Sequence, residues 1–354
     1  MPQLFEPYTL RSITLKNRIV VSPMCEYSAV DGVPNDWHFV HLGSRAVGGA
    51  ALVFTEATAV EADGRISPED TGIYNDEQEA AWALIAAFVE AQGSVPGIQL
   101  AHAGRKASTG SPWSGIGPAG PEHGGWSPIW SSSPTAFADG WQTPVALDES
   151  GLERVRAAFR EGTVRSQRAG FKVIEVHAAH GYLMGQFLSP LVNQRTDEYG
   201  GTLENRMRFP LEIVSIVREA WPAELPILVR ISCTDWAEGG WDVQQSIAFA
   251  KECKRLGIEA IDCSSGGTVP WQKIELGPGY QVPFAEAVRR DAGIATAAVG
   301  LITEPRQAEA ILEEGKADLI VLARELLRDP YWPRRAAKEL GAQIPVPPQY
   351  ARAW

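Results

Sequence analysis

The sequence predicts an α/β protein built as a single (β/α)8 TIM barrel. Short apolar runs rich in β-branched residues alternate along the chain with longer amphipathic stretches. There are eight such runs, which is the number of strands that closes a barrel of this kind. Several runs are apolar throughout, as in Ala50–Phe54, and this is typical of parallel strands buried on both faces. A length of 354 residues suits one barrel domain over residues 1–354.

The individual elements follow from this alternation. The predicted strands are Asn17–Val21, Ala50–Thr55, Gly97–Ala101, Lys172–His177, Ile227–Ile231, Ala260–Ser264, Ala295–Gly300 and Asp318–Ala323. Among the stretches between them, Leu152–Ala169, Gln244–Leu256 and Pro305–Glu314 keep apolar residues on one helical face, and each ends at or next to a glycine. Asp76 opens one acidic first turn and Asp148 opens another.

Two segments interrupt the alternation. Residues 1–16 precede the first strand, and we expect a small hairpin that plugs the bottom of the barrel. Residues 104–147 are rich in Gly, Pro, Ser and Trp and show no clear period. Because they follow the third strand, we expect this insertion to form a lid over the catalytic mouth.

The composition indicates which classes of binding partner and which cellular compartment to expect. The formal net charge of -11 argues against nucleic acids and anionic membrane surfaces as partners. Cys25, Cys233, Cys253 and Cys263 show no CxxC spacing, which fits a reducing cytoplasm and predicts neither disulfides nor a zinc or iron–sulfur site. No signal peptide and no apolar run of about 20 residues is evident. We therefore expect a cytoplasmic protein with no bound metal.

The polar residues that follow the predicted strands are the candidates for chemistry, since TIM-barrel active sites lie at the carboxyl ends of the strands. They include three histidines, two tyrosines and several cations. In chain order they are Ser22, Cys25, Tyr27, Glu56, Gln99, His102, Arg105, Lys106, His177, His180, Tyr182, Arg230, Ser264 and Arg324. No lysine ends the sixth strand, where a Schiff-base aldolase could carry one.

Several long motifs resemble the old yellow enzyme family of flavin-dependent reductases. They are Ser22–Cys25, Gln99–Lys106, His177–Leu191, Asn193–Gly201, Glu204–Arg206 and Arg324–Pro330. The similarity covers essentially the whole chain. The cysteine in the first motif, the paired histidines and the ending Gln349–Trp354 resemble the short-chain branch, which includes xenobiotic reductases and thermophilic-like ene-reductases.

The resemblance implies that FMN is the cofactor. Arg230 is suited to stabilise negative charge at the flavin N1 and C2=O, and Gln99 offers a donor and an acceptor to the N3–O2 edge. Gly300 permits close approach of the phosphate and Arg324 supplies charge, while Ala323 stands where the family usually has glycine. The remaining predicted FMN contacts are Ser22, Pro23, Met24, Cys25 and Ala57.

The resemblance also implies catalytic roles. His177 and His180 would donate hydrogen bonds to a substrate carbonyl oxygen, and Tyr182 would protonate the α-carbon. Tyr27 would contact the same carbonyl, and Cys25 would tune the flavin without acting as a nucleophile. Without the resemblance, the two histidines could equally be a zinc pair or hydrogen-bonded core residues.

The end of the chain suggests an oligomer. In similar short-chain enzymes a C-terminal arginine reaches the active site of a neighbouring subunit. We therefore expect residues 343–354 to lie at a subunit interface of a homodimer or homotetramer, with Arg352 and Trp354 contacting the neighbour's substrate. Trp271, after the sixth strand, is a further candidate for substrate contact.

The expected reaction is ping-pong transfer of hydride. NADPH or NADH would reduce FMN, and flavin N5 would then reduce the activated C=C bond of an α,β-unsaturated carbonyl or nitro compound. Two alternatives remain at this stage. One is a non-redox (β/α)8 isomerase or aldolase that binds a phosphorylated substrate, and the other is a flavin-binding protein without turnover.

Overall fold

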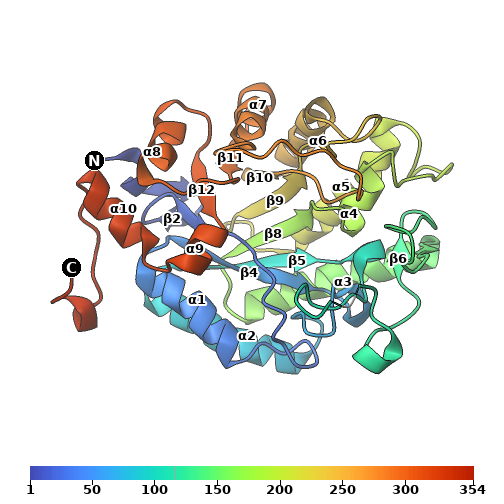
Figure 1. The fold of residues 1–354 in the computed structure, drawn as a ribbon, viewed down its shortest axis with the longest axis horizontal. Coiled ribbons are helices and arrows are strands. Elements are labelled where there is room, and N and C mark those ends of the chain that lie inside the picture. Colours follow the sequence, from blue (N-terminus) through green and yellow to red (C-terminus); the bar gives the residue numbers. More distant parts are fainter. Residues whose placement is uncertain (116) are drawn as a thin grey trace.

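A closed barrel of eight parallel strands lies at the centre of the computed structural model, which describes residues 1–115 and 117–354 (Figure 1). Neighbouring strands follow the order β10-β11-β12-β3-β4-β5-β8-β9. Their bounds are β3 Ile19–Val21, β4 Leu52–Ala59, β5 Val95–Ala101, β8 Val173–Ala178, β9 Ile227–Ser232, β10 Ala260–Ser264, β11 Ala295–Ala298 and β12 Leu319–Leu322. The predicted (β/α)8 barrel and all eight predicted strand positions are confirmed.

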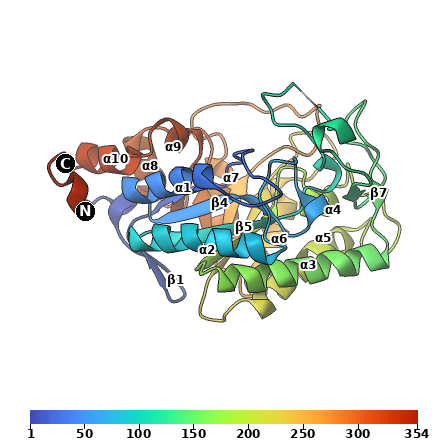
Figure 2. The same cartoon turned by 90° about the horizontal axis from the view of Figure 1, so that it is seen from below.

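Helices surround the barrel and cover the outer faces of its strands (Figure 2). The helices are α1 Asp36–Gly48, α2 Asp76–Ala91, α3 Glu149–Arg168, α4 Leu183–Leu188, α5 Leu203–Ala220, α6 Val243–Arg255, α7 Val282–Ala292, α8 Pro305–Glu313, α9 Arg324–Arg328 and α10 Trp332–Leu340. Local signals start several of them. For example, Asp76 lies in the first turn of α2, and the Asp148 carboxylate accepts a hydrogen bond from Gly151 N at the start of α3.

The prediction for the second strand was too short. We expected it to end at Thr55, but β4 continues to Ala59 with a shift of register against β5 between Phe54 and Ala57. At such a bulge, successive side chains no longer point regularly to opposite faces of the strand. Glu56 therefore lies within the strand and is buried, instead of following its end.

The predicted hairpin is present. Strand β1 (Tyr8–Leu10) pairs antiparallel with β2 (Ile13–Leu15). Leu10 and Leu15 are buried in one apolar cluster with residues of seven barrel strands, among them Val20, Phe54 and Leu228. The hairpin thus closes the amino-terminal end of the barrel with apolar side chains.

The insertion after β5 lies over the opposite end. It contains the 3-10 turns η3 (Gly104–Lys106) and η4 (Pro121–His123) and a short pair of strands, β6 (Trp130–Ser131) and β7 (Val145–Ala146). Strand β6 lies next to α4, which follows β8 (Figure 1). The prediction that this segment lies above the carboxyl ends of the strands agrees with these contacts.

The C-terminus lies beside α10, at the end of the molecule away from α4 and β6 (Figures 1 and 2). The Trp354 ring stacks on Tyr331, with centroids 6.3 Å apart. Within the described residues, none of the helices combines the length and apolar character that crossing a membrane requires.

Candidate active site

Three aromatic side chains from the end of β8 converge at the mouth of the barrel. The ring centroids of His177 and His180 are 5.1 Å apart, and that of Tyr182 is 5.0 Å from His177 and 6.5 Å from His180. His180 has a positive φ of 57°, which is rare for a residue with a side chain. This turn of the backbone brings the second imidazole beside the first.

The hydrogen bonds of the two imidazoles indicate which nitrogens face the site. The pKa values of His177 and His180 lie well below the usual range, first because of burial and then because of the nearby Arg230 charge. Both rings are therefore neutral, with one N–H each. Ala179 N donates to His177 Nδ1 at 3.2 Å, so His177 carries its proton on Nε2. His180 Nε2 lies 2.7 Å from Ser264 Oγ. If that hydroxyl donates, His180 offers an Nδ1–H.

Tyr182 lies in a small apolar cluster with two of the predicted flavin contacts. Cys25 and Tyr182 pack against a buried group that contains Ala57 and Ala101. Burial is the main cause that raises the pKa of the Tyr182 phenol and of the Cys25 thiol. Tyr182 is thus held as a protonated acid, and Cys25 as a thiol that is a poor nucleophile.

Tyr27, at the mouth of the barrel, contacts the insertion that forms the lid. Its backbone has a positive φ of 47°, and its ring lies edge-on to Trp113 of the insertion at 5.3 Å. Burial raises the pKa of the Tyr27 phenol as well. Both tyrosines therefore keep their hydroxyl protons at neutral pH.

Lys106 belongs to the site, although the sequence analysis gave it no role. Its ammonium donates to His180 O at 2.9 Å and Gly267 O at 3.0 Å, and it lies 5.0 Å from the centroid of the Tyr182 ring. Burial lowers its pKa to about 8. Lys106 thus ties the first turn of the lid to the loops after β8 and β10.

The Arg230 side chain is buried inside the barrel, between Ser22, which follows β3, and Asp262 of β10. Its Nη1 donates to Ser22 Oγ at 3.0 Å, and its Nε lies 3.3 Å from Asp262 Oδ2 in poor hydrogen-bond geometry. Gln99 Nε2 donates to Glu175 Oε1 at 2.7 Å. Burial raises the pKa of Glu175 to about 8. These contacts form a polar layer inside the barrel, and Glu175 and Asp262 had not been singled out from the sequence.

A cavity of about 200 Å³ lies beyond β11 and β12. Its lining includes Gly300, Ala323 and Arg324, together with Gln281. Gly300 has a φ of 125°, and a Cβ there would come within 3.0 Å of Gln281 Nε2. The Arg324 side chain is exposed, and its guanidinium has no hydrogen-bond partner among the described residues. The cavity combines a close backbone approach with an uncompensated cation, which suits a phosphate.

The residues present fit FMN. Arg324 and Gly300 would hold the phosphate, and the buried Arg230, with its Nε still free to donate, would face the carbonyl at the flavin pyrimidine edge. Gln99 has a carboxamide oxygen left to accept from that edge. The predicted cofactor contacts Ser22, Cys25 and Ala57 line the same end of the barrel; Pro23 and Met24 lie between them, half-buried.

Two groups of side chains have the composition of metal ligands. Their potential ligand atoms lie within 4.8 Å of one another in Cys25, Glu56 and Asp70 and in Glu61, Asp63 and His102. In the second group, Arg154 pairs with both carboxylates, at 2.9 and 3.2 Å, and supplies the positive charge. In the first group, burial raises the pKa values of both carboxyl groups, that of Glu56 to about 8, so that they remain largely protonated.

The tail residues are not brought to this site within the chain. Arg352 and Trp354 are exposed, and Trp354 packs on α10 at the other end of the molecule. Trp271 is 61% exposed on the loop after β10. Their predicted contact with substrate depends on a neighbouring subunit or on a bound ligand.

Comparison with known proteins agrees with this geometry. Residues 3–343 match the model of the NADH:flavin oxidoreductase / NADH oxidase family. The chain is 49% identical over 353 residues to an NADPH dehydrogenase of Geobacillus sp. (strain WCH70), covering 99% of this chain and 98% of that protein. It is 48% identical over 356 residues to an NADPH dehydrogenase of Listeria monocytogenes serovar 1/2a, covering both completely.

Among solved structures, morphinone reductase in complex with tetrahydroNAD superposes with a TM-score of 0.79 at 28% identity, over 99% of this chain and 94% of that one. The family match spans the barrel and every strand-end residue described above. The match favours a redox enzyme over an isomerase or aldolase built on the same fold. The chain belongs to the NADH:flavin oxidoreductase / NADH oxidase family, and it is an FMN-dependent oxidoreductase of the old yellow enzyme type.

Proposed function

We propose that this protein uses NADPH to reduce the C=C bond of α,β-unsaturated carbonyl compounds, in two half-reactions at one site. The observation that carries the proposal is the pair of neutral imidazoles beside a protonated tyrosine at the end of β8. When bound, FMN supplies the hydride acceptor and donor.

His177 and His180 bind the substrate oxygen in this proposal. Two neutral N–H groups that converge on one carbonyl oxygen stabilise the negative charge that develops there as hydride reaches the β-carbon. His177 offers Nε2–H because Nδ1 already accepts from Ala179 N. The lid and the buried position of His177, which is 3% exposed, exclude water from this oxygen.

Tyr182 supplies the proton in this proposal. Its hydroxyl stays protonated because burial raises its pKa, and its ring lies against His177, so that donor and oxyanion site are adjacent. The α-carbon, which becomes basic once the oxygen carries negative charge, accepts this proton. Tyr27, on the lid side, contacts the same substrate, and Cys25 packs near the flavin ring.

NADPH as the reductant follows from the relatives named NADPH dehydrogenase. We also propose that residues 343–354 lie at the interface of a homodimer or homotetramer, where Arg352 and Trp354 complete the neighbour's substrate pocket. Support comes from the exposure of this tail and from its distance from the chain's own site.

The test is anaerobic reduction of the purified yellow protein. We expect NADPH to bleach the flavin absorbance, and 2-cyclohexen-1-one to restore it. Bleaching without reoxidation by any enone or nitroalkene would contradict the proposed acceptor class. A protein that NADPH fails to bleach would favour the non-catalytic flavin-binding alternative.

A further inference from the structure

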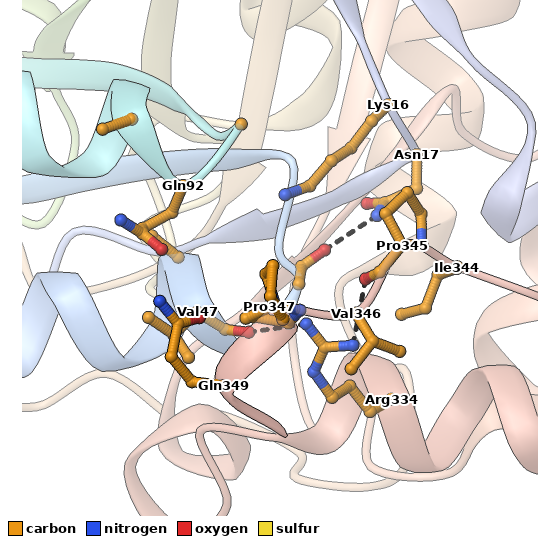
Figure 3. Close-up of a pocket in the computed structure, with 15 residues that line it drawn as sticks. Lys16, Asn17, Val47, Gln92, Arg334, Ile344, Pro345, Val346, Pro347 and Gln349 are labelled. Atoms are coloured by element: carbon orange, nitrogen blue, oxygen red, sulfur yellow. Dashed lines mark hydrogen bonds between the residues drawn. The ribbon is translucent and has the colours of Figure 1, made fainter. Parts of the chain in front are cut away.

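A second cavity lies at the end of the barrel where β3 begins, beside Lys16 and Asn17 (Figure 3). Its volume is about 500 Å³, which is within the range of small-molecule sites. One wall is formed by Lys16 and Asn17 before β3, another by the ends of α1 and α2, and the third by Arg334 of α10 and the tail segment 344–349.

Two cations face this cavity, and no acidic residue belongs to its described lining. Arg334 is 4% exposed. Its Nη1 donates to Pro345 O at 3.1 Å and its Nη2 to Val47 O at 2.8 Å, while its Nε has no partner among the described residues (Figure 3). The Lys16 ammonium, which has three donors, gives one to Ser94 Oγ at 3.1 Å.

Neither cation forms an ion pair with a carboxylate in the described part of the chain, and the Arg334 guanidinium instead lies 5.8 Å from the centroid of the Trp354 ring. The carbonyl of Val47, near the end of α1, offsets part of the Arg334 charge. Two Lys16 protons remain without an acceptor, and the Arg334 Nε–H, which is shielded from solvent, has none among the described residues. Burial and the Arg334 charge together lower the pKa of Lys16 to about 8. A buried arginine beside a partly buried lysine calls for a counter-charge.

We propose that this cavity is a binding site for a small dianionic oxyanion, such as phosphate or a short dicarboxylate, held between Lys16 and Arg334. The carboxamides of Asn17, Gln92 and Gln349 line the same space and can complete its hydrogen bonds. The tail forms one wall and is fixed to Arg334 through Pro345 O, so an occupied site would also hold the tail in place. This inference does not depend on the proposed reaction, but the tail wall belongs to residues 343–354, the segment that the proposed function assigns to a subunit interface.

The experiment is calorimetric titration of the FMN-loaded protein with inorganic phosphate and, separately, with malonate. Sodium chloride at matched ionic strength is the control titrant. Bound FMN would occupy the cavity near Gly300, and the flavin absorbance would report any anion that enters the active site. We expect saturable binding of one anion per chain with no change in the flavin spectrum.

Two variants locate the site. Lys16→Gln removes a cation from the cavity and should weaken binding by about tenfold or more, which is the size of effect expected for a desolvated charge-assisted contact. Lys338→Gln removes an exposed charge from the helix that carries Arg334 without touching the cavity, and should change affinity less than about twofold. Affinity for malonate, which is a dianion throughout this range, should also fall as the pH rises through about 8, where Lys16 loses its proton.

Three results would overturn the proposal. The first is the absence of saturable binding up to about 10 mM of either anion, which leaves only non-specific ionic effects. The second is equal weakening in the two lysine variants. The third is binding that perturbs the flavin spectrum and is indifferent to Lys16→Gln, which would place the anion at the active site.

Discussion

Replacing His177 or His180 by alanine should slow one half-reaction and leave the other unchanged. In the proposed mechanism, each substitution removes one N–H donor to the substrate oxygen. Loss of one such preorganised donor costs about 2.7–4 kcal/mol, or about 10²–10³ in rate. Because both donors act on a single oxygen, the double variant should lose less than the product of the two single effects.

Stopped-flow absorbance separates the half-reactions. Anaerobic bleaching by NADPH should stay within about threefold of the parent protein, whereas reoxidation by 2-cyclohexen-1-one should fall by the factor given above. His177→Asn is the matched control, because its amide retains an N–H donor and should recover part of the loss. The imidazole pair would lose its proposed role if reoxidation by the enone proved as fast in the double variant as in the parent.

Three further predictions concern neighbouring groups. Tyr182→Phe should slow reoxidation by about 10²–10⁴ while NADPH still bleaches the flavin, measured by the same stopped-flow assay; an unchanged rate would assign the proton to water. Ser264→Ala removes the partner of His180 Nε2, and ¹⁵N NMR of the histidine side chains should then show a changed tautomer at His180, whereas a purely structural contact would leave the tautomer as it was. Glu56 has a pKa raised from 4.5 to about 8, so the folded state holds a proton that the unfolded chain releases, and this contribution to stability is lost as the pH rises through that interval. Glu56→Gln should therefore flatten the fall in urea-unfolding free energy between these pH values, and an unaltered slope would show that Glu56 is ionised in the folded protein.

The sequence was sufficient for the barrel because each strand is an isolated apolar run with a helix after it. It also placed His177, His180 and Tyr182 together, since residues that follow one strand must meet at its end. It did not identify the pairing of Glu175 with Gln99, because such contacts join different strands. The sequence does contain a sign of this pairing. Glu175 lies within an apolar strand, and a buried carboxyl group there needs a polar partner inside the barrel.

The extension of β4 shows a different limit. Thr55 looked like the end of the strand because Glu56 is charged, yet the bulge after Phe54 buries this carboxyl against His38 at 2.9 Å. Local polarity marks a strand end only when the charged side chain reaches water. Glu56 does not need to reach water because it has a buried partner, His38 of α1. The hydrophobic pattern of the strand does not reveal such a partner from another element.

The hairpin at the amino-terminal end has a consequence for enzyme kinetics. Leu10 and Leu15 fill that end of the barrel, so small molecules arrive from the side that the insertion covers. Under the proposed mechanism, reductant and acceptor would then use the same entrance in turn. A large excess of either one would keep the other out, so that turnover would decline at high concentrations of NADPH or of enone.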